Sequence, residues 1–374
     1  MSAEHELLIV GGGPAGLATA IAARLAGLDV AVVDRAAPPL DKACGEGLMP
    51  DALACLRGLG VALASSRLAP FHGIRYLDGD LVAEGRFPGV SGAGVRRLHL
   101  HEAMCRRARE VGVTLLWRRR VRGLVDAGGV LGVETDAGAL TARWLVGADG
   151  LRSRVRRWSG LDGRASRRRR FGVRRHFAVA PWTDLVEVWW ADGCEAYVTP
   201  VGAEEVGVAL LWSDRKAGFD ELMSAFPALA ERLRGASVTS RDRGAGSLRQ
   251  RARAVARGRL ALVGDASGYV DAITGEGLAL AFRQAGALVA SLERGDLGLY
   301  ERRHREIGRW ADGVTRLLLR VEARPWLRRR VIRALARDPA LFSRVLAVHS
   351  GAWPLRGLGL ASAPRLLWGL VRPY

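Results

Sequence analysis

The stretch LLIVGGGPAGLATAIAARLAGLDVAVVDR, residues 7–35, joins two apolar runs through a glycine cluster and a series of small residues. The first apolar run ends at glycine, which is typical of a parallel strand buried on both faces. Small residues at helical spacing from Ala15 to Ala26 predict a helix, and DVAVVD (29–34) predicts a second strand. The order predicts a βαβ unit with a right-handed crossover.

Gly11, Gly13 and Gly16 form a G-x-G-x-x-G pattern at the predicted turn from strand to helix. The first glycine allows a tight turn, the second lets a pyrophosphate approach the backbone, and the third lets helix and strand pack closely. The helix N-terminus adds free N–H groups and the positive end of its dipole. Asp34 closes the second strand and can accept from a ribose hydroxyl. The segment therefore predicts a dinucleotide site.

The composition of the 374-residue chain is that of an ordinary globular protein, because 49% of the residues are hydrophobic. Its length allows two domains, or one large domain with an insertion. Charges interrupt the apolar runs well short of about 18 residues, so we expect no membrane-spanning helix, and we expect no signal peptide. The 4 cysteines show no paired or metal-type spacing, which favours a reduced cytoplasm and no metal site.

The net charge of +19 comes almost entirely from arginine. We interpret it as the ordinary surface of a protein from a GC-rich genome, since charge informs about association and not about fold. A basic patch that meets an anionic surface is the alternative. Nucleic-acid binding is not favoured, because the sequence shows neither aromatic residues interleaved with basic ones nor a recognisable RNA-binding module.

Two later stretches repeat the pattern of a buried strand followed by a polar turn. LVGADGLRSRVR (145–156) contains an Asp149–Gly150 turn, and LALVGDASGYVDAITGEGLALAF (260–282) contains Gly264–Asp265 and then Gly275–Gly277. Asp265 is expected at the carboxyl end of a strand, where doubly wound sheets bind ligands and a carboxylate can accept from a ribityl hydroxyl. Amides at 275–278 can face the pyrimidine edge of a flavin from a helix N-terminus.

The three motifs, in this order and spacing, resemble the flavoprotein group of p-hydroxybenzoate-hydroxylase-like monooxygenases, geranylgeranyl reductases and flavin-dependent halogenases. The resemblance covers about residues 5–300 and implies bound FAD. DKACGEGLMP (41–50) is most similar to the K-x-C-G-G/E-G-L/I stretch of the geranylgeranyl-reductase branch. Ala272 stands where hydroxylases commonly have proline, and the signatures of tryptophan-type halogenases are not visible.

The resemblance also implies which residues contact the flavin. The loop after the second strand would run along the ribityl chain and ring, with Lys42 supplying positive charge and Cys44 near the isoalloxazine, as a candidate catalytic thiol or as a small buried filler. Arg97 would touch the side of the flavin. The full set is Gly11, Gly13, Pro14, Ala15, Gly16, Asp34, Arg35, Lys42, Cys44, Gly45, Arg97, Val121, Asp149, Asp265, Gly275, Gly277 and Leu278.

Three residues are candidates for contact with substrate. Trp189, Tyr197 and Pro200 fall where the substrate sheet of the family covers the flavin, although aromatic residues on alternating strands more often belong to the core. His99, His101 and His176 show no partner pattern in the sequence, so we do not expect them to be catalytic.

The predicted fold class is α/β, with a doubly wound, Rossmann-like FAD-binding domain, an inserted antiparallel β substrate domain and a C-terminal helical extension. We assign residues 1–70, 95–160 and 255–300 to the FAD-binding domain, 71–94 and 161–254 to the substrate domain, and 301–374 to the helical region.

The resemblance implies an FAD-dependent oxidoreductase. The favoured activity is a monooxygenase that uses NADH or NADPH and acts on an apolar aromatic or polyketide-type metabolite. The alternative is reduction of isoprenoid double bonds, which needs a long apolar tunnel. Trp310, Val314, Leu317 and Val321 share one face of a predicted basic helix, which either packs on the FAD domain or attaches a cytoplasmic protein to a membrane surface.

Overall fold

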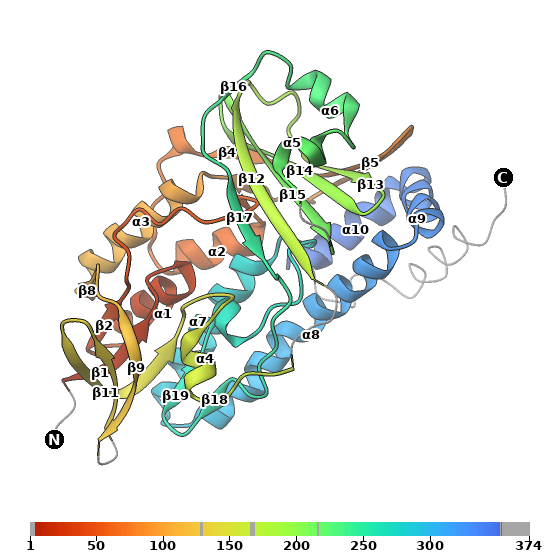
Figure 1. Cartoon of the computed structure of the whole chain (residues 1–374). Helices are drawn as coiled ribbons and strands as arrows, with labels where there is room; N and C mark the ends of the chain where they lie inside the picture. Colours follow the sequence, from red (N-terminus) through yellow and green to blue (C-terminus); the bar gives the residue numbers. More distant parts are fainter. Residues whose placement is uncertain (1–3, 128–129, 165–168, 215–216, 352, 354–374) are drawn as a thin grey trace.

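The computed structural model describes residues 4–127, 130–164, 169–214, 217–351 and 353. Two large sheets lie beside each other, and a row of C-terminal helices runs along both of them (Figure 1). The predicted fold class is confirmed. Residues 354–374 of the predicted C-terminal helical region lie outside the described residues.

The first sheet has the order expected of a doubly wound nucleotide-binding fold. Five parallel strands run β19-β11-β1-β2-β8, so that β1 lies between β2, the next strand in the chain, and the sequence-distant β11. These strands are β1 (His5–Val10), β2 (Val30–Val33), β8 (Thr114–Leu116), β11 (Gly138–Gly147) and β19 (Leu260–Leu262). The short β18 (Ala256–Arg257) extends the sheet beside β19, and β9 (Val121–Ala127) with β10 (Val130–Thr135) forms a meander with β11.

Burial on both faces explains why the first strand is continuously apolar. Leu7 and Ile9 pack in a core cluster with the helices, and Leu8 and Val10 pack in a second cluster with the meander. The helices on the first face are α1 (Pro14–Leu25), α2 (Pro50–Gly58), α3 (Arg97–Glu110) and α7 (Gly277–Leu292). The short helix α4 (Arg154–Trp158) belongs to the opposite side, where Val155 joins the second cluster.

The second sheet is formed by the segments that the sequence assigns to the substrate domain. Its strand order is β16-β12-β15-β14-β13-β5-β6, with β17 also paired to β12, and all pairs are antiparallel except β13 with β5. The strands are β5 (Gly73–Asp78), β6 (Leu81–Arg86), β12 (Arg170–Ala178), β13 (Val186–Ala191), β14 (Cys194–Gly202), β15 (Glu205–Ser213), β16 (Ser237–Val238) and β17 (Arg243–Gly246).

Two helices and a small sheet complete this region. The helices α5 (Phe219–Met223) and α6 (Pro227–Arg232) pack their apolar residues against one face of the second sheet, and the strand-rich sequence pattern did not predict them. A three-stranded sheet of β3 (Gly47–Leu48), β7 (Gly92–Gly94) and β4 (Ala69–Phe71) connects the two large sheets. Short 3₁₀ turns occupy Ser65–Arg67 and Gly264–Ser267.

The C-terminal helices bridge the two sheets. Helix α8 (Leu297–Glu322) packs on α7, and α9 (Pro325–Arg337) and α10 (Pro339–His349) pack on β5 and β6. Ile332, Leu335, Phe342 and Leu346 share a core cluster with Val188 of the second sheet. Among the described residues, no helix is both long enough and apolar enough to span a bilayer.

A buried charge cluster joins the three parts of the chain. Arg170 of β12 donates from Nε to Asp271 Oδ2 at 2.9 Å and from Nη2 to Glu195 of β14, and its Nη1 lies 3.6 Å from Glu322 Oε2 of α8. One guanidinium thus faces three buried carboxyl groups. Burial, together with the Glu322 and Asp271 carboxylates, outweighs the opposing effect of Arg170 and raises the pKa of Glu195 to about 8.

Glu195→Gln should therefore become more stable than the wild type as pH rises. The folded protein holds the Glu195 proton up to about pH 8, whereas the unfolded chain releases it near pH 4.5, so the wild type loses stability across this window. We expect the unfolding free energy of the glutamine variant minus that of the wild type to increase by about 1–3 kcal/mol between pH 5 and pH 8.5. Urea unfolding measures it, with exposed Glu231→Gln as the control. A difference that does not change with pH would contradict an elevated Glu195 pKa.

Candidate functional site

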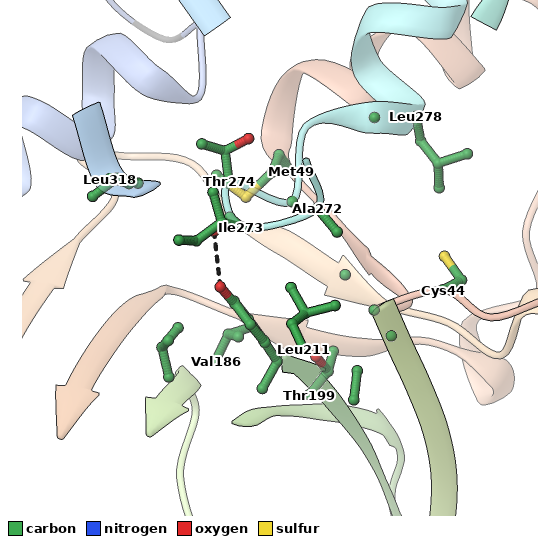
Figure 2. Close-up of a pocket in the computed structure, with 18 of the residues that line it drawn as sticks. Cys44, Met49, Val186, Thr199, Leu211, Ala272, Ile273, Thr274, Leu278 and Leu318 are labelled. Atoms are coloured by element: carbon green, nitrogen blue, oxygen red, sulfur yellow. Dashed lines mark hydrogen bonds between the residues drawn. The ribbon is translucent and has the colours of Figure 1, made fainter. Parts of the chain in front are cut away.

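A large cavity lies between the first sheet, the second sheet and the C-terminal helices. Its volume is about 980 Å³. Its walls come from the glycine-rich turn at 13–15, the loop at 42–49, one face of the second sheet, the loop at 272–278 and the inner faces of α8, α9 and α10. Figure 2 shows Cys44 and Leu318 on opposite sides of this space, with Ala272, Ile273 and Leu211 between them.

The glycine-rich turn fits the roles expected from its spacing. Gly11 has φ +114°, and a Cβ there would lie 2.4 Å from Ala148 O; a Cβ on Gly16 would lie 1.9 Å from Gly11 O. These two positions therefore exclude side chains because of close packing. A Cβ on Gly13 would meet nothing within 4 Å, and Gly13 lines the cavity. The second glycine thus leaves open space at the N-terminus of α1, where a pyrophosphate fits.

Two side chains hold this turn in place. Asp34 accepts from Gly12 N at 2.8 Å and from Ala36 N at 2.9 Å. His101 Nδ1 accepts from Leu40 N at 3.2 Å, so its Nε2 carries the hydrogen and donates to Gly12 O at 2.8 Å. Burial lowers the pKa of His101 to about 4, which keeps the ring neutral. The sequence shows no partner pattern for His101, because its partner Gly12 lies 89 residues away in the chain.

In the second motif, the carboxylate of Asp149 bonds to the backbone of the same segment and does not line the cavity. Asp149 Oδ2 accepts from Arg154 N at 2.6 Å and from Val155 N at 3.2 Å, so that the side chain caps α4. Its neighbours Ala148 and Gly150 line the cavity, and Asp149 itself does not. A direct contact of Asp149 with FAD stays a prediction.

The loop at 42–47 forms one wall of the cavity. Lys42, Cys44, Gly45 and Glu46 all line it. Burial raises the pKa of the Cys44 thiol, although the Arg97 charge opposes this, so the sulfur holds its proton at neutral pH. A Cβ on Gly45 would meet nothing within 4 Å, which leaves room for a ligand beside the backbone.

Two charged residues in the wall have buried atoms available for a ligand. Arg97, the first residue of α3, is 5% exposed, and its Nη1 has no hydrogen-bond partner among the described residues. Asp265 lines the cavity, and its pKa is raised by burial while Lys42 and Arg97 lower it. A guanidinium donor and a carboxylate acceptor match the oxygens and hydroxyls of a flavin and its ribityl chain. The residues of this wall therefore fit FAD.

The loop after β19 supplies the opposite wall. Gly275 has φ +71°, a conformation that favours glycine, and Gly277 begins the 16-residue helix α7. Gly275, Gly277 and Leu278 all line the cavity. The amides at the start of α7 can therefore reach a ligand there, as the sequence predicted, and the helix dipole favours negative charge at this point.

Of the three residues predicted to contact substrate, Tyr197 lines the cavity, whereas Trp189 and Pro200 do not. Tyr197 lines the cavity and donates from its hydroxyl to Ile273 O at 3.0 Å, the dashed line in Figure 2. Trp189 lies on the other face of its strand, because Val186 and Val188 face the cavity and side chains alternate. Its indole donates to Glu187 at 3.0 Å instead. The remaining residues that do not line the cavity are Gly11, Gly16, Asp34, Arg35, Val121 and Pro200.

Val121 and Arg35 occupy different surroundings. Val121 is buried in the core cluster of the meander, and Arg35 is exposed. Their predicted contacts with FAD stay predictions. In the described part of the chain, no group of three His, Cys, Asp or Glu residues is arranged to hold a metal ion.

Comparison with known proteins decides the family. Residues 4–295 match the model of a family described as an FAD binding domain. The chain belongs to this FAD-binding family. Curated relatives include a menaquinone reductase of Mycobacterium tuberculosis, 31% identical over 77% of this chain and 76% of that protein. The 6-methylpretetramide 4-monooxygenase of Streptomyces rimosus is 31% identical over 79% of this chain and 78% of that protein.

Further members extend the comparison. A digeranylgeranylglycerophospholipid reductase of Methanothermobacter thermautotrophicus is 26% identical over 82% of this chain and 83% of that protein. A solved flavoprotein/dehydrogenase of Cytophaga hutchinsonii shares the fold with a TM-score of 0.82 at 18% identity, over 97% of this chain and 98% of that chain. The protein described by the present structure is therefore an FAD-dependent oxidoreductase.

Proposed function

We propose that the protein reduces double bonds in the isoprenoid chain of a lipid, with NADH or NADPH as the source of electrons. The observation that carries this proposal is the cavity, whose part away from the Cys44 loop has mostly apolar walls. Those walls include Val186, Val314, Leu318, Val345 and Leu346. An isoprenoid chain offers no hydrogen-bonding groups, and such a wall suits it.

A polyhydroxylated aromatic substrate fits this part of the cavity less well. Each of its hydroxyl groups needs a partner when buried, at a cost of about 1–3 kcal/mol if none is found. The Tyr197 hydroxyl is already bonded to Ile273 O. The sequence favoured hydroxylation over reduction of double bonds. We reverse this preference because the C-terminal helices add an apolar extension to the cavity, which a local sequence pattern does not reveal.

The wall residues have distinct roles in the proposed reaction. FAD, once bound and reduced by NADH or NADPH, would supply the hydride for the double bond. Arg97 and Asp265 hold the cofactor through a donor and an acceptor, and the amides at the start of α7 favour the negative charge of its reduced form. The apolar walls exclude water. Cys44 Sγ carries a proton at neutral pH because burial raises its pKa, and we assign to it the proton that completes the reduction.

Mass spectrometry of one converted substrate tests this function. With NADPH and no oxygen, a geranylgeranyl lipid should gain two hydrogen atoms for each reduced double bond. In D₂O, one of the two should be a deuterium that does not exchange. A product heavier by one oxygen atom, formed only when oxygen is consumed, would contradict reduction and establish hydroxylation.

Hydroxylation of a polyketide-type metabolite is the second candidate. Its support is the similarity to the 6-methylpretetramide 4-monooxygenase, which extends over 79% of this chain. The same mass measurement with aromatic polyketides and oxygen decides between the two functions.

The outer surface of the C-terminal helices supports peripheral membrane contact. Trp310, Leu317 and Trp326 are 38%, 57% and 62% exposed, and the first two also line the cavity. The same helices expose Arg309, Arg316, Arg320, Arg324 and Arg330. Aromatic and leucine side chains among cations are typical of a surface that lies on an anionic bilayer. The inner faces of these helices pack on the protein, and the composition of the outer surface supports the proposed membrane contact.

Vesicle co-sedimentation should detect this contact. We expect binding to vesicles with anionic lipid, weaker binding to neutral ones, and loss of binding at high salt, since each basic residue near the surface contributes about 1 kcal/mol. Leu317→Ser with Trp326→Ala should reduce binding at least about tenfold, because apolar burial contributes about 1.5–3 kcal/mol per side chain. Trp158→Ala, which removes a 37% exposed tryptophan elsewhere, is the control. Equal recovery with neutral and anionic vesicles would exclude an electrostatic membrane contact.

A further inference from the structure

A buried glutamate in the cavity wall has an unusual backbone conformation. Glu46 has φ +60°, in the left-handed region that side chains other than glycine rarely adopt, and it is 3% exposed. Its backbone N donates to Cys44 Sγ at 3.4 Å, and its backbone O accepts from Val95 N at 3.0 Å. The carboxylate is thus held at the cavity beside the thiol.

The Glu46 carboxylate has two partners, one on each oxygen. Oε1 accepts from Arg97 N at 2.6 Å, at the N-terminus of α3. Oε2 contacts Nε2 of His176, a fully buried residue of β12. Gly207 makes room for this contact, since a Cβ there would lie 3.2 Å from Glu46 Oε2 and 3.4 Å from the His176 ring.

The Nδ1 side of the His176 ring faces a residue that is partly exposed at the surface. Nδ1 lies 2.8 Å from Ser240 Oγ and 2.8 Å from Arg174 Nη1. A guanidinium can only donate, so Nδ1 accepts and Nε2 carries the hydrogen that it donates to Glu46. Ser240 is partly exposed, on the segment that follows β16. The chain of contacts from Glu46 through His176 to Ser240 therefore connects the cavity with the surface.

Charged side chains surround the contacts from Glu46 through His176 to Ser240. Arg97 and Arg174 line the cavity with Glu46, and Arg174 also donates to Asp41, which Arg243 pairs at 2.7 Å. A neutral imidazole next to a carboxylate can release the proton at Nε2 and take up another at Nδ1, so this arrangement can transfer protons.

We propose that Glu46, His176 and Ser240 conduct protons between the cavity and solvent. Two-electron reduction of FAD requires protons from solvent, and Glu46, His176 and Ser240 form a continuous series of contacts from the cavity wall to the surface. A proton enters at His176 Nδ1 from the Ser240 hydroxyl when Arg174 releases Nδ1 and keeps its bond to Asp41. The proton at Nε2 passes to Glu46 Oε2 and reaches the cavity beside Cys44. Glu46 and His176 are positioning and relay residues, and the path serves reduction of the cofactor whatever the substrate is.

The test separates electron arrival from proton uptake. The FAD-loaded protein is mixed anaerobically in a stopped-flow instrument with reduced methyl viologen, which delivers electrons without protons, in weak buffer with a pH indicator. Viologen oxidation reports electron arrival, and the indicator reports proton uptake. In the wild type, uptake should keep pace with electrons. In Glu46→Gln and His176→Gln, uptake should lag at least about tenfold, since positioned acid–base groups contribute roughly 10²–10⁴-fold to proton transfer.

Further variants keep the outcome decisive. Ser240→Ala leaves the Glu46 contacts in place, so a slower uptake there supports the path even where the Glu46 variant fails to fold. His72→Gln, which changes a half-exposed histidine paired with Asp184, should behave as the wild type. If Glu46→Gln and His176→Gln hold FAD and take up protons without a lag, the carboxylate serves only to anchor α3 and the proposal is wrong. No substrate is present, so this result is independent of the proposed lipid reduction.

Discussion

Gly13→Val should abolish FAD binding while the protein still folds. The φ of Gly13 is −75° with ψ 179°, which valine adopts readily, and a Cβ there meets no atom of the protein within 4 Å. The valine methyl groups would instead occupy the space at the N-terminus of α1 where a pyrophosphate must approach the backbone. We expect the affinity for FAD to fall at least about 100-fold, or about 2.8 kcal/mol, as measured by flavin fluorescence titration of the apoprotein.

A matched control exists in the same chain. Gly218 caps α5 with φ −94° and ψ 170°, and a Cβ there also meets nothing within 4 Å. It does not line the cavity, so Gly218→Val should bind FAD as the wild type does. If Gly13→Val retains full affinity while circular dichroism shows a folded protein, the pyrophosphate does not lie at this turn.

Leu318→Trp should shorten the substrates that the enzyme accepts. Leu318 belongs to α8 and lines the cavity on the side away from Cys44 (Figure 2). An indole there fills the apolar extension, at an overpacking cost of about 1–3 kcal/mol in stability. We expect kcat/KM for a 20-carbon isoprenoid lipid to fall about 100-fold, while a five- or ten-carbon analogue loses less than about threefold.

The measurement compares kcat/KM for substrates of different chain length with the same variant, so a lower yield of folded protein does not affect the ratio. FAD content should remain that of the wild type, because Leu318 and the glycine-rich turn lie in different parts of the wall. Leu25→Trp, at a 53% exposed position at the end of α1, is the control for adding an indole. Equal loss for long and short substrates would show that the extension does not hold the chain.

Local sequence was sufficient for the features that depend on backbone conformation and strand order. The glycines of the first motif specify a turn because side chains are excluded by neighbours a few residues away or on the adjacent strand, as at Gly16, where a Cβ would strike Gly11 O. The apolar runs before Gly11 and Asp149 specify buried parallel strands, since both faces of such strands are covered. These local rules predicted the βαβ unit, a dinucleotide site and the position of Asp265, and the resemblance to a flavoprotein group implied FAD.

Contacts between residues far apart in the chain were decided only by tertiary structure. His101 and His176 had no visible partners in the sequence, yet they bond to Gly12 and Glu46, which are 89 and 130 residues away. Strand alternation allowed either face of β13 to line the cavity, and packing on α9 and α10 placed Val188 there and Trp189 opposite. The apolar extension of the cavity exists because α8 packs on α7 while α9 and α10 pack on the second sheet. The periodicity of these helices predicts an apolar face but not the surface on which it packs.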